Sequence, residues 1–213
     1  EESFNSILLW EFDEGLGRGV ARDQYDKIHP VPFAVYLPER EFFYPLWPDL
    51  FSMIPRDYSI GQRDTVFEVA GATAGIAICF DIVDDAIVWA MMDEGADIIF
   101  APTNNADFGQ TDQSVQQLAI ARMRAIETGR SVVNISTVGT SAVMDPTGAT
   151  LDRLPTYTEG YLLLDVPLAQ HTTPATWIKR NLEVLVGALT VAGLITAGVG
   201  ARARRGVDDP LGF

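Results

Sequence analysis

Cysteine, histidine and basic side chains are scarce in this chain. Its 213 residues include one cysteine and two histidines, and a single cysteine excludes an internal disulfide. Three such side chains are too few for a zinc site of cysteine and histidine ligands, although carboxylates can bind harder metals. The 15 lysines and arginines face 29 acidic side chains, for a net charge of −14, which argues against nucleic-acid binding. We therefore expect no nucleic-acid partner, no metal and no other cofactor.

Long hydrophobic runs are also rare, with one exception near the C-terminus. Residues 182–201 read LEVLVGALTVAGLITAGVGA and contain one charged side chain, Glu183. As a helix this run is about 30 Å long, the thickness of a bilayer core. Its glycines weaken a soluble helix but are common in membrane helices. The run predicts a transmembrane helix, and a buried core helix is the alternative.

The charges that flank this run bear on orientation. Lys179 and Arg180 precede it, and Arg202, Arg204 and Arg205 follow it. Basic residues favour the cytoplasmic side of a membrane span, so the excess of three over two predicts a cytoplasmic C-terminus. The expected organisation is a domain over residues 1–178 on the extracytoplasmic side, a span over 182–201 and a cytoplasmic tail over 202–213.

The N-terminal residues do not resemble a targeting segment. Glu1 and Glu2 are acidic, whereas a signal peptide begins with a basic region followed by an apolar stretch. The apolar stretch 4–12 is typical of a strand that has neighbours in a sheet. We therefore expect this chain to be part of a longer protein.

Regular structure is expected to alternate between strands and helices. Helical spacing with glycine stops predicts helices over 84–96 and 114–130. The segment 28–60 is rich in proline and aromatic residues, and predicts a long loop without regular structure. Apolar runs bounded by turn residues predict strands over 6–12, 65–71, 73–80, 96–103, 131–137, 140–148 and 160–168. This pattern predicts a layered α/β domain.

Cys79 is the first residue that could carry chemistry. It ends an apolar strand, a place where functional residues often lie, although free cysteines are also common as buried hydrophobic residues. The polar loop 102–109 follows the next strand and could share a cleft with it. A thiol needs a nearby cation or base to become a nucleophilic thiolate.

Three side chains could activate this thiol. Lys27 lies in a segment rich in proline and phenylalanine, where an ammonium is partly desolvated; a solvated lysine is the alternative. His29 could act as the base of a cysteine–histidine pair. His171 lies just ahead of the apolar run, and histidine is a poorer candidate for the base than Lys27.

Four segments, 25–33, 75–81, 103–109 and 124–130, resemble motifs of the carbon–nitrogen hydrolase (nitrilase) superfamily. The YDKIHPVPF form of the first, the NNADFG loop and the C-terminal apolar run together resemble its membrane branch, the apolipoprotein N-acyltransferases. The resemblance implies a nitrilase-like αββα sandwich of class α/β, incomplete at the N-terminus, followed by one C-terminal transmembrane helix.

The resemblance also implies a Glu-Lys-Cys triad. Cys79 is then the nucleophile, and Lys27 stabilises the thiolate and the tetrahedral oxyanion. The backbone N–H of Phe80 completes an oxyanion hole, and Asp81 matches an acidic position that follows the family's cysteine. Substrate contacts are implied for three further side chains, Phe33, Asn104 and Asn105.

The implied reaction is a two-step acyl transfer in the plasma membrane. The cysteine takes a fatty acyl chain from a phospholipid as a thioester. It then passes the chain to the N-terminal amine of a diacylated apolipoprotein. Its expected partners are therefore the phospholipid donor, the apolipoprotein acceptor and the membrane. The apolar segment 33–54 fits a lid that contacts acyl chains, and a loop packed over the sheet is the alternative.

Two departures from the family pattern leave other functions open. The family's base glutamate lies further upstream, and neither Glu1 nor Glu2 matches its motif. Val35 occupies a position where the family usually has a second glutamate, and Glu39 lies four residues further on. One alternative is an amidase-type hydrolase tethered to the membrane, in which water resolves the thioester. The other is a catalytically impaired relative that binds lipoprotein.

Overall fold

The computed structural model describes residues 2–54, 56–178 and 181–208 of the chain. The chain divides into two compact units, Glu1–Thr173 and Pro174–Phe213. The first unit therefore ends at Thr173, whereas the expected boundary is residue 178. Each unit is described by itself.

A six-stranded mixed sheet is the centre of the first unit. Its strand order is β3-β4-β5-β6-β7-β8. Three neighbouring strands, β4, β5 and β6, are parallel, with Ile76 opposite Phe100 and Thr103 opposite Ser136. The remaining pairs are antiparallel. The strands span Val66–Val69, Ala72–Ile76, Ile98–Thr103, Ser131–Ser136, Ala142–Met144 and Thr150–Arg153. Because β4, β5 and β6 run in the same direction, their carboxyl ends meet at one edge of the sheet.

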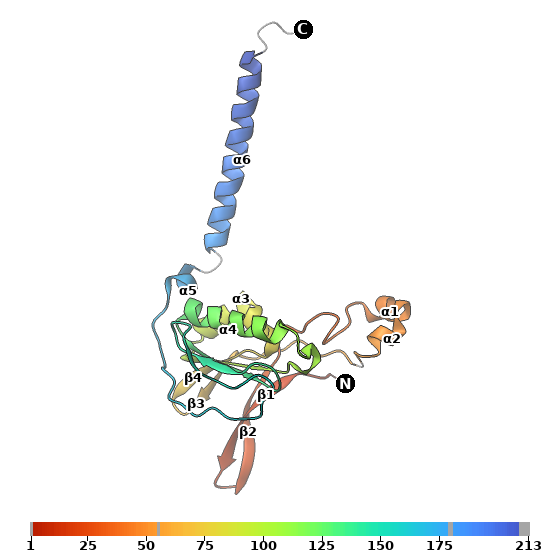
Figure 1. Cartoon of the computed structure of the whole chain (residues 1–213), viewed down its shortest axis with the longest axis vertical. Coiled ribbons are helices and arrows are strands. Elements are labelled where there is room, and N and C mark those ends of the chain that lie inside the picture. The colour runs from red at the N-terminus through yellow and green to blue at the C-terminus, as the bar shows by residue number, and fades with distance from the viewer. Residues whose placement is uncertain (1, 55, 179–180, 209–213) are drawn as a thin grey trace. The chain divides into compact units, whose positions relative to one another are not determined.

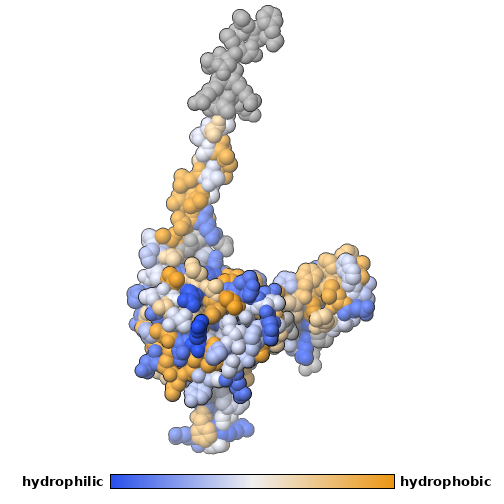
Figure 2. Space-filling model, viewed as in Figure 1, coloured by the Kyte–Doolittle hydropathy of each residue, from blue (hydrophilic) through white to orange (hydrophobic). Residues whose placement is uncertain are grey.

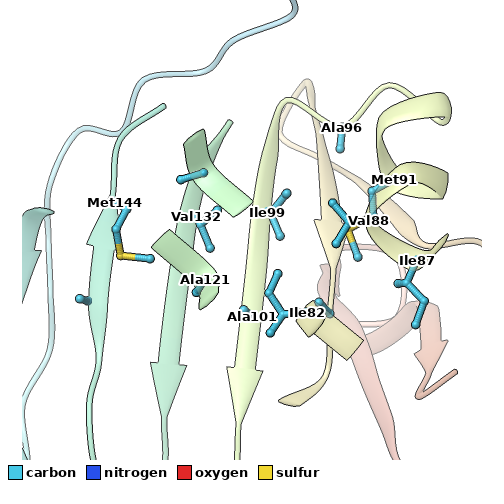
Figure 3. Packing of buried hydrophobic residues seen from close by; sticks show 13 residues of the cluster. Ile82, Ile87, Val88, Met91, Ala96, Ile99, Ala101, Ala121, Val132 and Met144 are labelled. Atoms are coloured by element: carbon cyan, nitrogen blue, oxygen red, sulfur yellow. The ribbon is translucent and has the colours of Figure 1, made fainter. Parts of the chain in front are cut away.

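Two helices, α3 (Asp85–Asp93) and α4 (Gln113–Thr128), cover one face of this sheet. Their apolar side chains pack on residues of the sheet that face them. Figure 3 shows Val88 and Met91 of α3 in the same buried cluster as Ile99 of β5. A Cβ at Gly75 would lie 3.0 Å from the Met91 sulfur, so the glycine permits the close approach of α3 to β4. The fully buried members of this cluster include Ala77, Ile82, Val88, Met91, Ile99, Ala121, Ala125, Val132 and Met144.

The base of a two-stranded ribbon packs against the other face of the sheet, and the rest of the ribbon projects away from it (Figure 1). The ribbon consists of β1 (Ser6–Asp13) and β2 (Arg18–Asp26), which pair antiparallel. Side chains alternate between the two faces of a strand, so residues adjacent to the helix-facing ones point to this side. Here they form a second buried cluster of Tyr25, Phe67, Ile76 and Ile78, against which Ile7 and Leu9 pack. The expected layered α/β fold is thus confirmed.

The segment between β2 and β3 contains short helices, which corrects the expected long loop without regular structure. These are α1 (Arg40–Phe43), the 3-10 helix η1 (Tyr44–Leu46) and α2 (Pro48–Phe51). Proline stands at the N-terminal positions of η1 and α2, where its missing N–H costs no helical hydrogen bond. Leu37, Phe51 and Ile54 form a small buried cluster within this segment.

The expected strand over 160–168 is wrong. These residues lie in an irregular extended segment, and Tyr161 and Leu163 are 86% and 89% exposed. An apolar alternation marks an extended chain, but a strand also needs a partner for its backbone groups, and β8 occupies the position beside β7. The sequence patterns also missed β2 and β8, whose side chains are largely exposed.

The second unit contains α5 (Pro174–Ile178) and α6 (Asn181–Asp208). Within α6, Asn181–Val199 has a mean hydropathy of 2.0, and none of it is buried. Figure 2 shows this apolar surface along the helix. By length and composition α6 can cross a membrane, and its exposure is unlike that of a core helix in a soluble domain.

Candidate active site

Cys79 lies just beyond the carboxyl end of β4, where the 3-10 helix η2 (Cys79–Val83) begins. Its backbone has a φ of 55°, in the left-handed region that non-glycine residues rarely adopt. Such a conformation costs about 1–3 kcal/mol and persists only where the surrounding structure enforces it. Here the carbonyl of Cys79 accepts a hydrogen bond of 3.3 Å from Gln117 Nε2 of α4. The thiol is free and partly buried.

Lys27 follows the last residue of β2 and is 2% exposed, so the solvated alternative is wrong. Its backbone N–H donates to Asn5 O, and its carbonyl accepts from Gly61 N–H. The Nζ atom donates to the carbonyl of Ile78 and lies 3.2 Å from Asp81 Oδ1. A buried ammonium needs such partners because desolvation strongly penalises an unpaired charge.

Asp81 is fully buried and ties the segments of the site together. Besides Lys27, its carboxylate accepts hydrogen bonds from Tyr25 OH at 2.9 Å, His29 N–H at 2.9 Å and Ile78 N–H at 3.2 Å. Burial, together with the neighbouring Asp81 carboxylate, raises the pKa of Tyr25 far above its usual value. Tyr25 is therefore a neutral donor to Asp81 across the whole pH range of protein stability.

His29 is engaged away from the thiol. Its Nδ1 lies 2.7 Å from Asp84 Oδ2, and its ring meets Phe80 edge-to-face at 5.5 Å. Partial burial opposes a low pKa for Asp84, but hydrogen bonds from His29 and from Ala86 N–H hold its pKa below the usual range. His29 is thus a partner of Asp84 and is absent from the described lining of the cleft that contains Cys79.

That cleft, which we term the cysteine cleft, has a volume of about 610 Å³. Lys27, Cys79 and Asn104 all line it, so the fold brings together residues that are far apart in the sequence. Asn104 directly follows β5 and Thr137 directly follows β6, beside the end of β4. Their meeting agrees with the tendency of α/β sheets to bind ligands beyond the carboxyl ends of parallel strands. Other lining residues are Phe4, Ile7, Val31, Val35, Tyr58 and Thr103.

Three other residues named from the sequence lie outside the described lining of this cleft. Phe33 lines a separate apolar pocket of about 460 Å³ and packs edge-to-face on Phe43. Asn105 is 1% exposed, and its Oδ1 accepts a hydrogen bond of 2.9 Å from Thr103. The Phe80 ring is 39% exposed and contacts His29.

Sequence reasoning missed two polar residues behind the thiol. Gln117 is 8% exposed, and besides Cys79 it contacts Thr103 Oγ1 through its Oε1 atom at 3.3 Å. Thr137 Oγ1 donates to Asn104 Oδ1 at 2.7 Å. A polar residue on the buried face of the helix predicted over 114–130 was the only available signal for Gln117. Nothing in the sequence singled out Thr137.

The described residues hold no group of three or more histidine, cysteine, aspartate or glutamate side chains that could bind a metal ion. The cysteine cleft offers a thiol and an ammonium together with hydroxyl and carboxamide side chains. A cysteine beside a buried cation is an arrangement suited to a thiolate nucleophile.

The family profile described as carbon-nitrogen hydrolase matches residues 4–173, and the chain belongs to this family. Its curated relatives include the apolipoprotein N-acyltransferase of Mycolicibacterium smegmatis, which is 34% identical over 92% of this chain and 30% of that protein. The apolipoprotein N-acyltransferase of Vibrio cholerae is 29% identical over 88% of this chain and 37% of that protein. The chain thus spans about a third of the length of the curated relatives it matches.

Solved structures share the fold. A Cys→Ala mutant of the Nesterenkonia AN1 amidase, from the nitrilase superfamily, matches with a TM-score of 0.53 and 19% identity, over 78% of this chain and 55% of that chain. The complex of the same kind of mutant with butyramide matches with a TM-score of 0.52 and 19% identity, over 80% and 57% of the two chains. At this identity the likeness concerns the fold.

Proposed function

We propose that this chain carries the acyl-transfer site of an apolipoprotein N-acyltransferase. The observation that supports the proposal most is the meeting of the Cys79 thiol and the buried Lys27 ammonium in one cleft, in a chain similar to enzymes of that name. The substrates are a phospholipid acyl donor and a diacylated apolipoprotein acceptor.

In the first step the Cys79 sulfur attacks the ester carbonyl of the phospholipid. A carbon–sulfur bond forms, the ester carbon–oxygen bond breaks, and the departing lysophospholipid oxygen takes up a proton. In the second step the acceptor amine attacks the thioester carbonyl, an amide forms, and the thiol is released with its proton restored. Dividing the transfer in this way replaces one difficult step by two easier ones.

Lys27 supplies positive charge beside both tetrahedral intermediates. Its ammonium is held by the Ile78 carbonyl and Asp81, so no reorganisation is needed when negative charge develops. The backbone N–H of Phe80 follows the strained Cys79 and serves as a further oxyanion donor. Among the described residues no carboxylate lines the cysteine cleft, so the mechanism assigns the role of general base to none of them.

The apolar segment 33–54 is proposed to contact the acyl chain. Phe33, Trp47, Leu50 and Met53 are between 51% and 78% exposed and line the 460 Å³ pocket described above. Exposed apolar groups of this density are typical of surfaces that meet lipid or a partner. Phe33 and Asn104 would then contact different parts of the donor.

The proposed location is the plasma membrane, with α6 as a span, the catalytic unit on the extracytoplasmic side and the C-terminus in the cytoplasm. Both substrates are lipids, so a membrane-bound site shortens the path to each. The charges on either side of the span support this orientation.

An amidase-type hydrolase is the competing function, since the fold is shared with an amidase and water could resolve the thioester. A catalytically impaired relative is a third possibility that Val35 supports, because it places an apolar side chain in the cleft lining.

The test uses the full-length natural protein in detergent micelles, a phospholipid with a labelled acyl chain, and a diacylated peptide. We expect a labelled thioester on Cys79 that disappears when the peptide becomes acylated, and loss of both signals in Cys79→Ala. Lys27→Arg should also lose activity, because a planar guanidinium does not replace a compact ammonium. Release of free fatty acid without peptide acylation would favour the hydrolase, and absence of any thioester the impaired relative.

A further inference from the structure

A second pocket lies at the same sheet edge as the cysteine cleft. It has a volume of about 360 Å³, and we term it the β6–β8 pocket after the strands that border it. It is lined by the residues after β6 and by the segment that follows β8, including Ser136, Thr137, Gly139, Ser141, Tyr157 and Glu159. Nothing in the acyl-transfer mechanism above uses it.

Thr137 lies between the two cavities, because it lines both of them. Its hydroxyl donates to Asn104 Oδ1, and its backbone N–H donates to Thr103 O at 3.1 Å. These bonds fix the partition between the cysteine cleft and the β6–β8 pocket. The two cavities therefore adjoin along the edge of the sheet.

The shape of the pocket is defined by its backbone. Tyr157 has a φ of 59°, its N–H donates to Gly139 O at 3.2 Å, and its hydroxyl donates to Gly109 O at 2.5 Å. A Cβ at Gly139 would lie 3.0 Å from Ser114 Cβ, so this loop packs tightly on α4. The pocket is thus built from residues tied to both β6 and α4.

The spacing along the sheet sets what the pocket can hold. Neighbouring strands are about 4.8 Å apart, so the end of β6 lies roughly 10 Å from the end of β4. An extended peptide advances about 3.3–3.6 Å per residue. A peptide whose N-terminal amine reacts at Cys79 therefore has its third residue about 7 Å away, and the side chain of that residue covers the remaining distance to the β6–β8 pocket.

The chemistry of the lining discriminates between the two substrates. Hydroxyl and backbone groups share it with the apolar side chains of Val138, Leu154 and Pro155 and with one carboxylate, Glu159. Its described residues include no lysine, arginine or histidine. Such a lining suits a peptide side chain, above all a cationic one, and repels the phosphate of a phospholipid.

We propose that the β6–β8 pocket is the acceptor subsite, which receives the side chain of about the third residue of the apolipoprotein and favours a basic one through Glu159. This inference rests on the proposed function and adds to it the specificity for the acceptor. The donor phospholipid does not use the pocket.

The experiment separates the two half-reactions in the full-length protein. Diacylated peptides that differ only in a lysine or a glutamate at the third residue serve as acceptors. We expect a two- to fivefold lower KM for the lysine peptide, the range of an exposed ion pair. Glu159→Lys should reverse this order. Thr158→Trp should raise the KM for both peptides, because the bulky ring occupies the rim of the pocket, whereas Thr156→Trp, outside the lining, is the matched control.

The rate of labelled thioester formation on Cys79 is the internal reference for a folded protein. Equal KM values for the two peptides, both in the wild type and in Glu159→Lys, would overturn the inference. So would KM values for Thr158→Trp that equal those of its control, Thr156→Trp. Absence of the wild-type thioester would instead overturn the proposed function, so the two failures are distinguishable.

Discussion

At the scale of single residues, the carboxylate of Asp81 is the group on which the polar end of the site depends. It holds the Lys27 ammonium, the Tyr25 hydroxyl and two backbone N–H groups in a fully buried position. Resemblance to a family motif predicted an acidic residue at this position. The hydrogen bonds in the structure explain what its carboxylate does there. Asp81 holds Lys27 in place, and in the proposed mechanism it acts through that ammonium.

Asp81→Ala is expected to destabilise the protein by about 3–5 kcal/mol, because it leaves a buried ammonium without its partner. Urea unfolding of the protein in detergent measures the change. Asp152→Ala is the control, since that side chain is exposed on β8. If Asp81→Ala lowers the free energy of unfolding no more than Asp152→Ala does, the ion pair makes no net contribution to stability.

Asp84 gives stability a dependence on acid pH. Its pKa is lower in the folded protein than the unfolded value of about 3.9. The stabilisation is therefore fully present above that value and is lost as the pH falls through the folded pKa. Asp84→Asn should reduce the free energy of unfolding at pH 6 and should differ less from the wild type as the pH falls below 4.

Unfolding midpoints measured between pH 6 and pH 3 test this expectation. Asparagine can still accept the N-terminal hydrogen bond that Asp84 takes from Ala86, so the substitution isolates the charge. Asp152→Asn is the exposed control. A constant difference between Asp84→Asn and the wild type across the pH range would contradict the assignment.

At the scale of elements, α4 ends at Gly129 because the next turn requires a left-handed backbone. Its φ is 65°, and its N–H donates to Ala125 O. A Cβ at this position would also lie 2.9 Å from Thr173 Cγ2. The glycine thus permits both the helix end and the approach of the segment that closes the first unit.

Gly129→Ala is expected to lower the free energy of unfolding by more than about 1 kcal/mol, because strain and a steric clash add. Gly71→Ala is the matched control: its φ is 83°, but no atom lies within 4 Å of the added Cβ. Thermal unfolding of both variants compares the two costs. If Gly129→Ala and Gly71→Ala lower the free energy of unfolding equally, the contact with Thr173 adds no cost.

At the scale of the whole molecule, the proposed topology places residues 1–173 and the C-terminal tail on opposite sides of a membrane. Cys79 is the single cysteine of this chain, so a background with Cys79→Ala and every cysteine outside the chain replaced allows one probe at a time. We expect a membrane-impermeant maleimide to label Thr156→Cys in this background in intact spheroplasts, and to label Asp208→Cys only after the membrane is permeabilised. The reverse pattern would invert the topology.

Much of the fold was predictable because local sequence patterns report local structure. The helices over Asp85–Asp93 and Gln113–Thr128 and the apolar strands β4, β5 and β6 agree with their predicted positions to within a few residues. The prolines at 45 and 48 were interpreted as signs of a loop, whereas they begin η1 and α2. Proline is excluded from the interior of a helix but is favoured in its first turn. Composition alone therefore does not tell whether a proline marks a loop or the start of a helix.

The sequence by itself determined the alternation of strands and helices, the membrane-compatible run and the motifs that contain Lys27 and Cys79. Only the tertiary structure decided that Asp81 pairs with Lys27, that Phe33 lines a different pocket from Asn104, and that Thr137 separates two cavities. The physical reason is the separation along the sequence over which each interaction acts. Periodicity and turn chemistry act between residues a few positions apart, whereas these contacts depend on parallel strand ends that meet only when the sheet has formed.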